Sequence, residues 1–301
     1  FSQNATWKNL VVPYYSKKYT ETESSYWIAN SAGLIEIDKK TRKQLTYHPD
    51  NSEIIGCAVN DVLATNDNQI YIATQSGGIF KFDGGHLIAI PNKETANKIQ
   101  ATNFLTQDHD ENIWFVGDHF NTTSSGNIFI IKNENGLKAY GKYSIPDVKQ
   151  MKSDYNSDIW ISTSKFLYKL DESHIKDSLD FTAIAPSNKE KILNFYFDSS
   201  NTLYIHSCTV RDDPNQCDVL YKYTNGQIEI YWDSGNLDFG YKLNSIYFKN
   251  NTFYILSSSD SDSQIDVIAN GIQTTVLRAK VQIPENQFLL TIIGSDQTNK
   301  L

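Results

Sequence analysis

The sequence predicts an all-β protein, a single β-propeller of four-stranded antiparallel blades. An aromatic residue between apolar or aromatic neighbours recurs six times, 43 to 50 residues apart, at Trp27, Tyr71, Trp114, Trp160, Tyr204 and Tyr254. Asn-Gly or Asp-Gly pairs recur at 83–84, 135–136, 225–226 and 270–271. Such pairs supply the positive φ angles of a tight hairpin turn. Short strands that repeat every 40–50 residues or so are typical of propeller blades.

Each repeat contains four strands, which we name a to d, and strand b carries the aromatic anchor. Residues 69–84 show the unit: alternation around Tyr71, a break at 76–78, a second alternating run and the 83–84 turn. We expect six blades, at approximately 20–47, 58–90, 101–140, 147–184, 192–232 and 243–278. In the fourth blade we assign strand d to 181–185 (FTAIA).

The two ends of the chain carry apolar runs without a complete repeat. We therefore treat 1–301 as one domain and expect segments 1–19 and 281–301 to share strands where the ring closes. The alternative is a seventh, partial blade built from both termini.

Aspartates mark the turns between strands a and b. Asp108, Asp154 and Asp198 each stand six residues before an anchor. Short Asx side chains accept hydrogen bonds from backbone amides, so turn formation explains them without a ligand. The alternative is a calcium ion at Asp108, Asp110 and Asn112, although the rest of an EF-hand pattern is missing.

Bulk properties exclude several functions. The net charge of −8 and the pI near 5.3 argue against a nucleic-acid partner. No apolar run reaches the roughly 18–20 residues of a membrane helix. The six histidines are scattered, and no motif for a metal, a cofactor or a catalytic constellation occurs. We therefore expect no cofactor and no enzymatic activity.

Two cysteines flank one loop between strand-like runs. Cys208 and Cys217 could form a disulfide across this hairpin, which would indicate an oxidising compartment outside the cytoplasm. The alternative is two unpaired thiols. The remaining Cys57 is expected to be a small buried hydrophobe.

Unequal loops point to a binding face. Connections b–c are long at 118–126, 208–217 and 257–263, and they share a face with the aromatic crossover 232–242. Variable loops on a rigid scaffold commonly carry function. The candidate contact residues are Asp118, His119, Phe120, Arg211, Asp212, Trp232, Phe239 and Tyr241. Tolerated drift of surface loops is the alternative.

A second set of polar residues begins the inner strands. Asn60, Asn103, Asn194 and Asn244 stand ten or eleven residues before their anchors and are expected near the mouth of the central channel. They could cap the local turns or form a polar ring for a ligand. The anchors Trp27, Trp114 and Trp160 are expected in the core between blades rather than on a carbohydrate platform.

The best-preserved repeats are YWIANSAGLIEID (26–38), IYIATQSGGIFKFD (70–83) and IWISTSKFLYKLD (159–171). They resemble the two-component regulator propeller repeat, with its I-W-I-[GA]-T and G-[LI]-x-x-[FYI]-D strands. The resemblance covers about residues 20–280 and implies an exported, periplasmic or cell-surface propeller of a bacterial sensor or envelope protein. It further implies recognition of glycans or other nutrients.

The favoured function is therefore a non-enzymatic binding module with a carbohydrate or protein partner. Two alternatives stay open. The chain could be a scaffold subunit of a cell-envelope assembly, or a propeller lyase or glycan-active enzyme. Glycoside hydrolysis would need two carboxylates facing one cleft, and the loop residues Asp212, Asp213, Asp260 and Asp262 are the nearest candidates.

Overall fold

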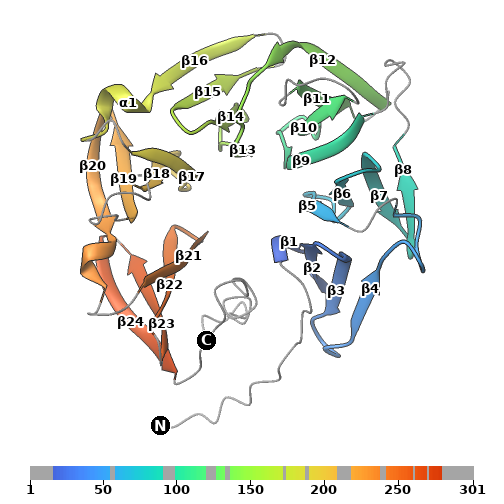
Figure 1. Cartoon of the computed structure of the whole chain (residues 1–301), viewed down its shortest axis with the longest axis horizontal. Coiled ribbons are helices and arrows are strands. Elements are labelled where there is room, and N and C mark those ends of the chain that lie inside the picture. The colour runs from blue at the N-terminus through green and yellow to red at the C-terminus, as the bar shows by residue number, and fades with distance from the viewer. Residues whose placement is uncertain are drawn as a thin grey trace.

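Six four-stranded antiparallel sheets stand around one axis, with strand a of each sheet innermost and strand d outermost (Figure 1). This computed structural model describes residues 16–54, 58–90, 99–119, 127–132, 136–171, 174–186, 190–208, 218–237, 242–259, 262–269 and 271–279. The predicted all-β propeller with six blades is thereby confirmed. The described residues contain a single four-residue α-helix and one short 3-10 helix.

Blades one to three use the first twelve strands in chain order. Blade one contains β1 (Ser16–Glu21), β2 (Ser25–Asn30), β3 (Gly33–Asp38) and β4 (Gln44–Tyr47). Blade two contains β5 (Val59–Ala64), β6 (Ile70–Thr74), β7 (Ile79–Asp83) and β8 (His86–Ala89). Blade three contains β9 (Ile99–Gln107), β10 (Ile113–His119), β11 (Asn127–Lys132) and β12 (Gly136–Ser144).

Blades four to six continue in the same way. Blade four contains β13 (Gln150–Ser153), β14 (Ile159–Ser162), β15 (Phe166–Leu170) and β16 (Ile175–Asp180), followed by α1 (Phe181–Ile184). Blade five contains β17 (Lys191–Phe197), β18 (Leu203–Cys208), β19 (Asp218–Thr224) and β20 (Gln227–Asp233), followed by the 3-10 helix η1 (Ser234–Asn236). Blade six contains β21 (Lys242–Lys249), β22 (Thr252–Ser258), β23 (Ser263–Ala269) and β24 (Ile272–Ala279).

Every blade in the described part of the chain is built from four consecutive strands. The expected first repeat began at residue 20, but β1 already begins at Ser16 and forms the inner strand of blade one. Within the described residues, no blade combines strands from the two ends of the chain. Shared strands were expected in segments 1–19 and 281–301; residues 16–19 belong to β1, and the rest of both segments lies outside the described residues.

Apolar side chains fill the spaces between neighbouring blades. Trp114 of blade three packs with Met151 and Ile161 of blade four in one such cluster. Trp27 packs in the same way between blades one and two. The expectation that the tryptophan anchors are core residues is confirmed for Trp27 and Trp114, which are 4% and 1% exposed.

Two local assignments were wrong. Residues 181–184 form helix α1 rather than strand d of blade four, because Asp180 caps the segment by accepting hydrogen bonds from the Thr182 amide at 3.0 Å and hydroxyl at 2.7 Å. Strand d is β16 instead.

In blade two the turn is Gly84–Gly85, with φ of 57° and 100°, because Asp83 still pairs with His86. The turn at Asn225–Gly226 is as predicted.

The aspartates of the a–b turns form the turns and also fix the anchors. One oxygen of Asp108 accepts the Asn112 amide at 2.9 Å, and the other accepts the indole N–H of Trp114 at 2.6 Å. Asp198 similarly accepts a turn amide at 2.8 Å and the hydroxyl of Tyr204 at 3.3 Å. The predicted turn chemistry is confirmed, and the link to the anchor explains the constant spacing of six residues.

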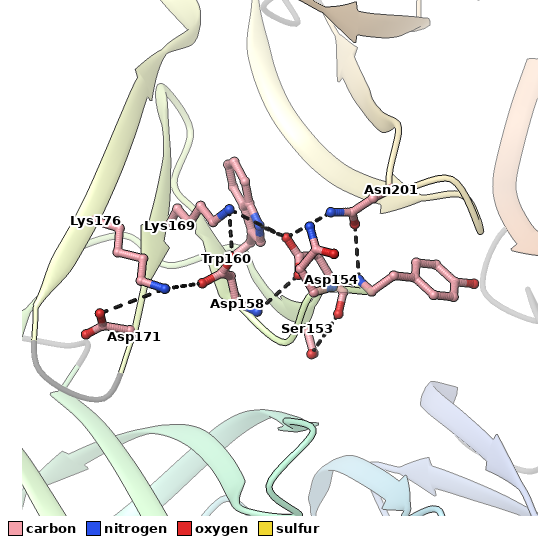
Figure 2. A network of polar contacts seen from close by, with 10 residues as sticks. Ser153, Asp154, Asp158, Trp160, Lys169, Asp171, Lys176 and Asn201 are labelled. Carbon is pink, nitrogen blue, oxygen red and sulfur yellow. Dashed lines mark hydrogen bonds and ion pairs between the residues drawn. The ribbon is translucent and has the colours of Figure 1, made fainter.

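In blade four, an aspartate binds the anchor in the same way, and ion pairs surround this contact (Figure 2). Asp154 accepts the indole N–H of Trp160 at 2.9 Å and backbone amides of its own turn. Beside it, Asp158 binds the ammonium groups of Lys169 at 2.7 Å and Lys176 at 2.6 Å. These two lysines hold the pKa of Asp158 below its ordinary value, against the opposing effect of its partial burial. The network therefore ties the a–b turn to strands β15 and β16.

The inner strands carry β-bulges close to their first residues. Register shifts interrupt the pairing of strands a and b in five blades, within β1, β5, β9, β17 and β21. A bulge inserts an extra residue, bends the strand and re-aims nearby side chains. Asn60 and Asn244 are such extra residues. The bulges therefore decide which side chains reach the ring axis.

Candidate functional site at the ring axis

Lys18 connects several blades across the ring axis. Its ammonium group donates a hydrogen bond to Gln150 Oε1 of blade four at 3.0 Å and lies 3.6 Å from Asp61 Oδ2 of blade two. It also lies 5.8 Å from the centre of the Phe104 ring of blade three. The Lys18 side chain is 30% exposed and so meets solvent, whereas that of Asp61 is only 4% exposed.

Asp61 is the carboxylate of this group, and it is almost completely buried. Its oxygens accept the amide of Val62 at 2.8 Å and the amide of Leu105 on β9 at 3.0 Å. Burial raises the pKa of Asp61, and the Lys18 ammonium and the two amides oppose that rise. Because the amides occupy both oxygens, Asp61 joins blades two and three and orients Lys18.

Lys152 lies on the same inner strand as Gln150, close to blade five. Its ammonium group donates to Asn194 Oδ1 at 2.9 Å and to the backbone carbonyl of Phe195. It stands 4.1 Å from the centre of the Tyr196 ring. Part of its surface stays open, but protein atoms surround the amine closely. This burial, together with the nearby Lys18 ammonium, holds the pKa of Lys152 well below its ordinary value.

Phe104 supplies the aromatic member of the group and a strained backbone. Its φ is +55°, which is rare for a bulky residue. The residue sits in the bulge of β9, where two residues oppose one on β10. Strain of this kind persists where the surroundings over-determine the conformation, as they commonly do at functional sites. We name Lys18, Asp61, Phe104, Gln150, Lys152 and Asn194 the axial cluster.

The axial cluster lies toward the face of the b–c connections. Lys18 pairs with Ala29, Asp61 with Ala73, and Gln150 with Ser162. Each partner is the last or second-to-last residue of its strand b. Asn194 likewise pairs with His206, near the end of β18. The cluster therefore lies toward the same face of the ring as the long loops that are predicted to bind a ligand.

The predicted binding face lies mostly outside the part of the chain that the structure describes. Phe120, Arg211, Asp212, Phe239 and Tyr241 lie outside the described residues. Asp118 and His119 end β10 at its b–c end, as the strand order requires. The face therefore remains a prediction for these seven residues.

Trp232 is a correction. We expected it in an exposed crossover, but it belongs to β20, pairs with Leu220 and is 3% exposed. Its indole N–H donates to Gln273 of blade six at 2.8 Å, and its ring packs with Phe253. Trp232 therefore joins blades five and six and presents no face to a ligand.

The predicted disulfide falls on the edge of the described region. Cys208 ends β18 opposite Asp218, whereas Cys217 and Cys57 lie outside the described residues. The disulfide therefore stays a prediction. His206 lies in β18, with its Nε2 at 3.0 Å from Asp218 Oδ1.

Of the expected asparagine ring, Asn194 belongs to the axial cluster. Asn60 instead donates to the backbone carbonyl of Thr102 at 3.0 Å, which links blades two and three. Sequence reasoning missed Lys18, Asp61, Phe104, Gln150 and Lys152. Asp61, Phe104, Gln150 and Asn194 all stand ten residues before their anchors, and this shared position was the available signal.

No group of three His, Cys, Asp or Glu side chains among the described residues is arranged to hold a metal ion. In the same part of the chain, no helix has the length and apolar character needed to cross a bilayer.

Comparisons with known proteins bear on the fold. No family model and no curated protein matches the sequence. Solved structures do match. The extracellular domain of BT4673 from B. thetaiotaomicron, assigned to a hybrid two component system, is 14% identical with a TM-score of 0.54. The alignment covers 91% of this chain and 44% of that one, so this chain spans less than half of its length.

Other matches have different functions. XC5397 from Xanthomonas campestris, a gluconolactonase, is 11% identical with a TM-score of 0.54, over 82% of this chain and 83% of that one. YCF48 bound to a D1 peptide is 12% identical with a TM-score of 0.58, over 92% and 82%. The likeness to BT4673 agrees with the resemblance to two-component regulator propellers. At these identities, what the chain shares with all three is the β-propeller fold.

Proposed function

We propose that this chain is a non-enzymatic recognition module of an exported protein, and that it binds a glycan or another small polar nutrient at the b–c end of the ring. The observation that carries the proposal is the axial cluster. Two ammonium groups, two side-chain amides, one carboxylate and an aromatic ring converge there from five blades. A few directional polar groups beside an aromatic face are typical of small-molecule sites.

The surrounding loops fit the same role. Asp118, His119, Phe120, Arg211, Asp212, Phe239 and Tyr241 remain the proposed outer contact residues, and Trp232 is withdrawn. A protein partner on this face is the second form of the proposal. The fold shared with an extracellular sensor domain and with a peptide-bound propeller is compatible with both forms.

Binding of a sugar library tests the proposal. The wild-type chain should bind at least one mono- or oligosaccharide on a glycan array. The Gln150→Ala variant should weaken that binding by about fivefold or more, because a hydrogen bond contributes roughly 1 kcal/mol. Absence of carbohydrate binding, together with capture of a protein partner that depends on Phe239 and Tyr241, would favour the second form.

An enzymatic alternative requires its own assay, because lactonases share the fold. Proton release from glucono-δ-lactone should not exceed the uncatalysed rate. Hydrolysis by the wild-type chain that the Asp61→Asn variant abolishes would overturn the non-enzymatic proposal.

A further inference from the structure

We propose that the axial cluster binds the carboxylate of an acidic sugar, such as a uronic acid, between the ammonium groups of Lys18 and Lys152. This inference rests on the proposed function and names the chemical class of its ligand. It follows from the placement of the two lysines, the count of charges around them, and the neutral groups beside them.

The two ammonium groups belong to one side of β13. Gln150 and Lys152 are two residues apart on this strand, so their side chains leave it on the same side. The Lys18 ammonium is held against Gln150 Oε1 at 3.0 Å. It therefore stands beside the side of the strand that carries Lys152. Like charges in such a partly desolvated place repel each other unless an anion lies close to both.

The described charges do not balance at this place. Asp61 is the carboxylate in contact with Lys18, and it already accepts two amide N–H groups. Lys152 contacts neutral acceptors, namely the Asn194 side chain and the Phe195 carbonyl. No carboxylate of the described residues lies within ion-pair distance of its amine. When both amines are protonated, two lysines thus face one carboxylate, and one further negative charge would complete the balance.

A single excess charge favours a carboxylate over a phosphate dianion. The two carboxylate oxygens can each accept a hydrogen bond from one ammonium group. The amides of Asn194 and Gln150 can pair with sugar hydroxyl groups, and the Phe104 ring offers an apolar surface for the sugar C–H face. Lys18, which is partly exposed, marks the side from which the ligand enters.

Binding should be coupled to protonation of Lys152. The groups that face its amine are Lys18 from β1, Tyr196 and the neutral Asn194 from β17, and Asp61 from β5 through Lys18. A bound carboxylate stabilises the protonated amine and so raises a pKa that burial has lowered. Affinity should be highest below the pKa of the free protein's Lys152. Above it, affinity should fall by up to about tenfold per pH unit.

Titration calorimetry with D-galacturonate, D-galactose and inorganic phosphate tests the inference. Between pH 6 and 9, galacturonate should bind about tenfold or more tightly than galactose or phosphate, and its affinity should decline as pH rises. Lys152→Met should weaken galacturonate binding by about 10- to 100-fold, the usual range for a charged hydrogen bond. Lys152→Arg should keep the binding and flatten the pH profile, because arginine does not titrate there.

Lys222→Met is the matched control. Lys222 lies on β19 and pairs with Glu229 at 3.5 Å, away from the axial cluster, so galacturonate binding should not change. Methionine can fill the volume of Lys152 without a buried charge, so the variant is expected to fold. If thermal melting shows that it does not, Lys18→Met makes the same test from blade one.

Several outcomes would overturn the inference. Equal affinity for galacturonate and galactose, or full affinity in a folded Lys152→Met variant, would show that the two lysines do not bind the carboxylate. The proposed function would then survive through neutral sugars. Equal or tighter binding of phosphate would refute the assignment to a carboxylate. Failure of every sugar, acidic or neutral, would remove the glycan form of the proposed function as well.

Discussion

The interface between blades three and four and the interface between blades six and one are built differently. The former is one apolar cluster, in which Trp114 and Ile130 of blade three pack with Met151 and Ile161 of blade four. At the latter, Tyr26, Ile28, Ile35 and Ile37 form a cluster within blade one. Leu256 and Ile265 form a separate cluster within blade six. The two apolar surfaces do not merge among the described residues.

Polar and aromatic contacts join blades six and one instead. The rings of Tyr19 and Tyr247 lie 5.6 Å apart, and Glu21 binds Lys249 at 2.5 Å and Lys39 at 3.0 Å. Ion pairs of this partly exposed kind contribute about 0–1 kcal/mol each, whereas burial of one large apolar side chain contributes roughly 1.5–3 kcal/mol. We infer that the ring opens first between blades six and one, which we call the seam.

Glu21 of the seam occupies a position that has a different role in other blades. Glu21 stands six residues before its anchor Trp27, at the position of Asp108 and Asp154. It points to lysines rather than to the anchor, and the Trp27 indole N–H has no hydrogen-bond partner among the residues that the structure describes. In blade one, the acidic residue at this position therefore binds blade six instead of holding the anchor of its own blade.

The largest effect should come from paired truncations of equivalent core residues. Ile161 and Ile28 each follow the anchor directly, and both are fully buried. Ile161→Ala should lower the free energy of unfolding by about 2–5 kcal/mol. Ile28→Ala should lower it by only about 2 kcal/mol, at the small end of that range, because the loss depends on how far the surrounding site can collapse. Urea denaturation measures both. Equal losses would contradict the weaker seam.

A smaller difference should separate two tryptophan anchors. Trp114→Phe removes a 2.6 Å hydrogen bond to Asp108. It should cost about 1–3 kcal/mol more than Trp27→Phe, because the Trp27 indole N–H has no partner in the described part of the chain. Both variants lose the same atoms from buried sites, so each controls for the volume change of the other. Similar melting temperatures for the two would show that the aspartate does not stabilise the anchor.

The smallest effect concerns the ion pairs of the seam and depends on pH. Burial raises the pKa of Glu21, but the ammonium groups of Lys249 and Lys39 outweigh this effect and hold the pKa below its ordinary value. The stabilisation is therefore present above the ordinary glutamate pKa of about 4.3 and is lost as pH falls through the lower, folded-state value.

Glu21→Gln should accordingly cost about 0.5–1 kcal/mol at pH 7 and almost nothing near pH 3. Thermal unfolding of both proteins across this range measures the difference. A gap that persists at pH 3 would mean that packing, rather than charge, joins the two blades at Glu21.

The features that recur from blade to blade could be predicted from the sequence. Six anchors, the aspartate turns and the Asn225–Gly226 hairpin depend on neighbouring residues, so local propensity and pattern are enough to find them. The prediction failed at 181–184, where the capping side chain of Asp180 outweighed an apolar run that suggested a strand. It also failed at Trp232, because the true length of β20 depends on its pairing with β19.

The axial cluster could be predicted only in part. Asn194 was expected near the axis, but its partner Lys152 is 42 residues away, and Lys18 and Gln150 are separated by 132 residues. No local pattern encodes such contacts. The bulges add a second difficulty, because one extra residue changes which side chains turn toward the axis.

The use of four consecutive strands in every blade has a consequence for synthesis on the ribosome. Each strand pairs with its neighbour in sequence, so a blade can complete its hydrogen bonds as soon as its own residues have emerged. Contacts close in sequence also speed folding, because less loop entropy is lost before they form. We expect blade one to be structured while blade six is still being translated. The nascent chain would then bury its apolar surfaces in order, each new blade packing against the blade before it. The seam between blades six and one would form last.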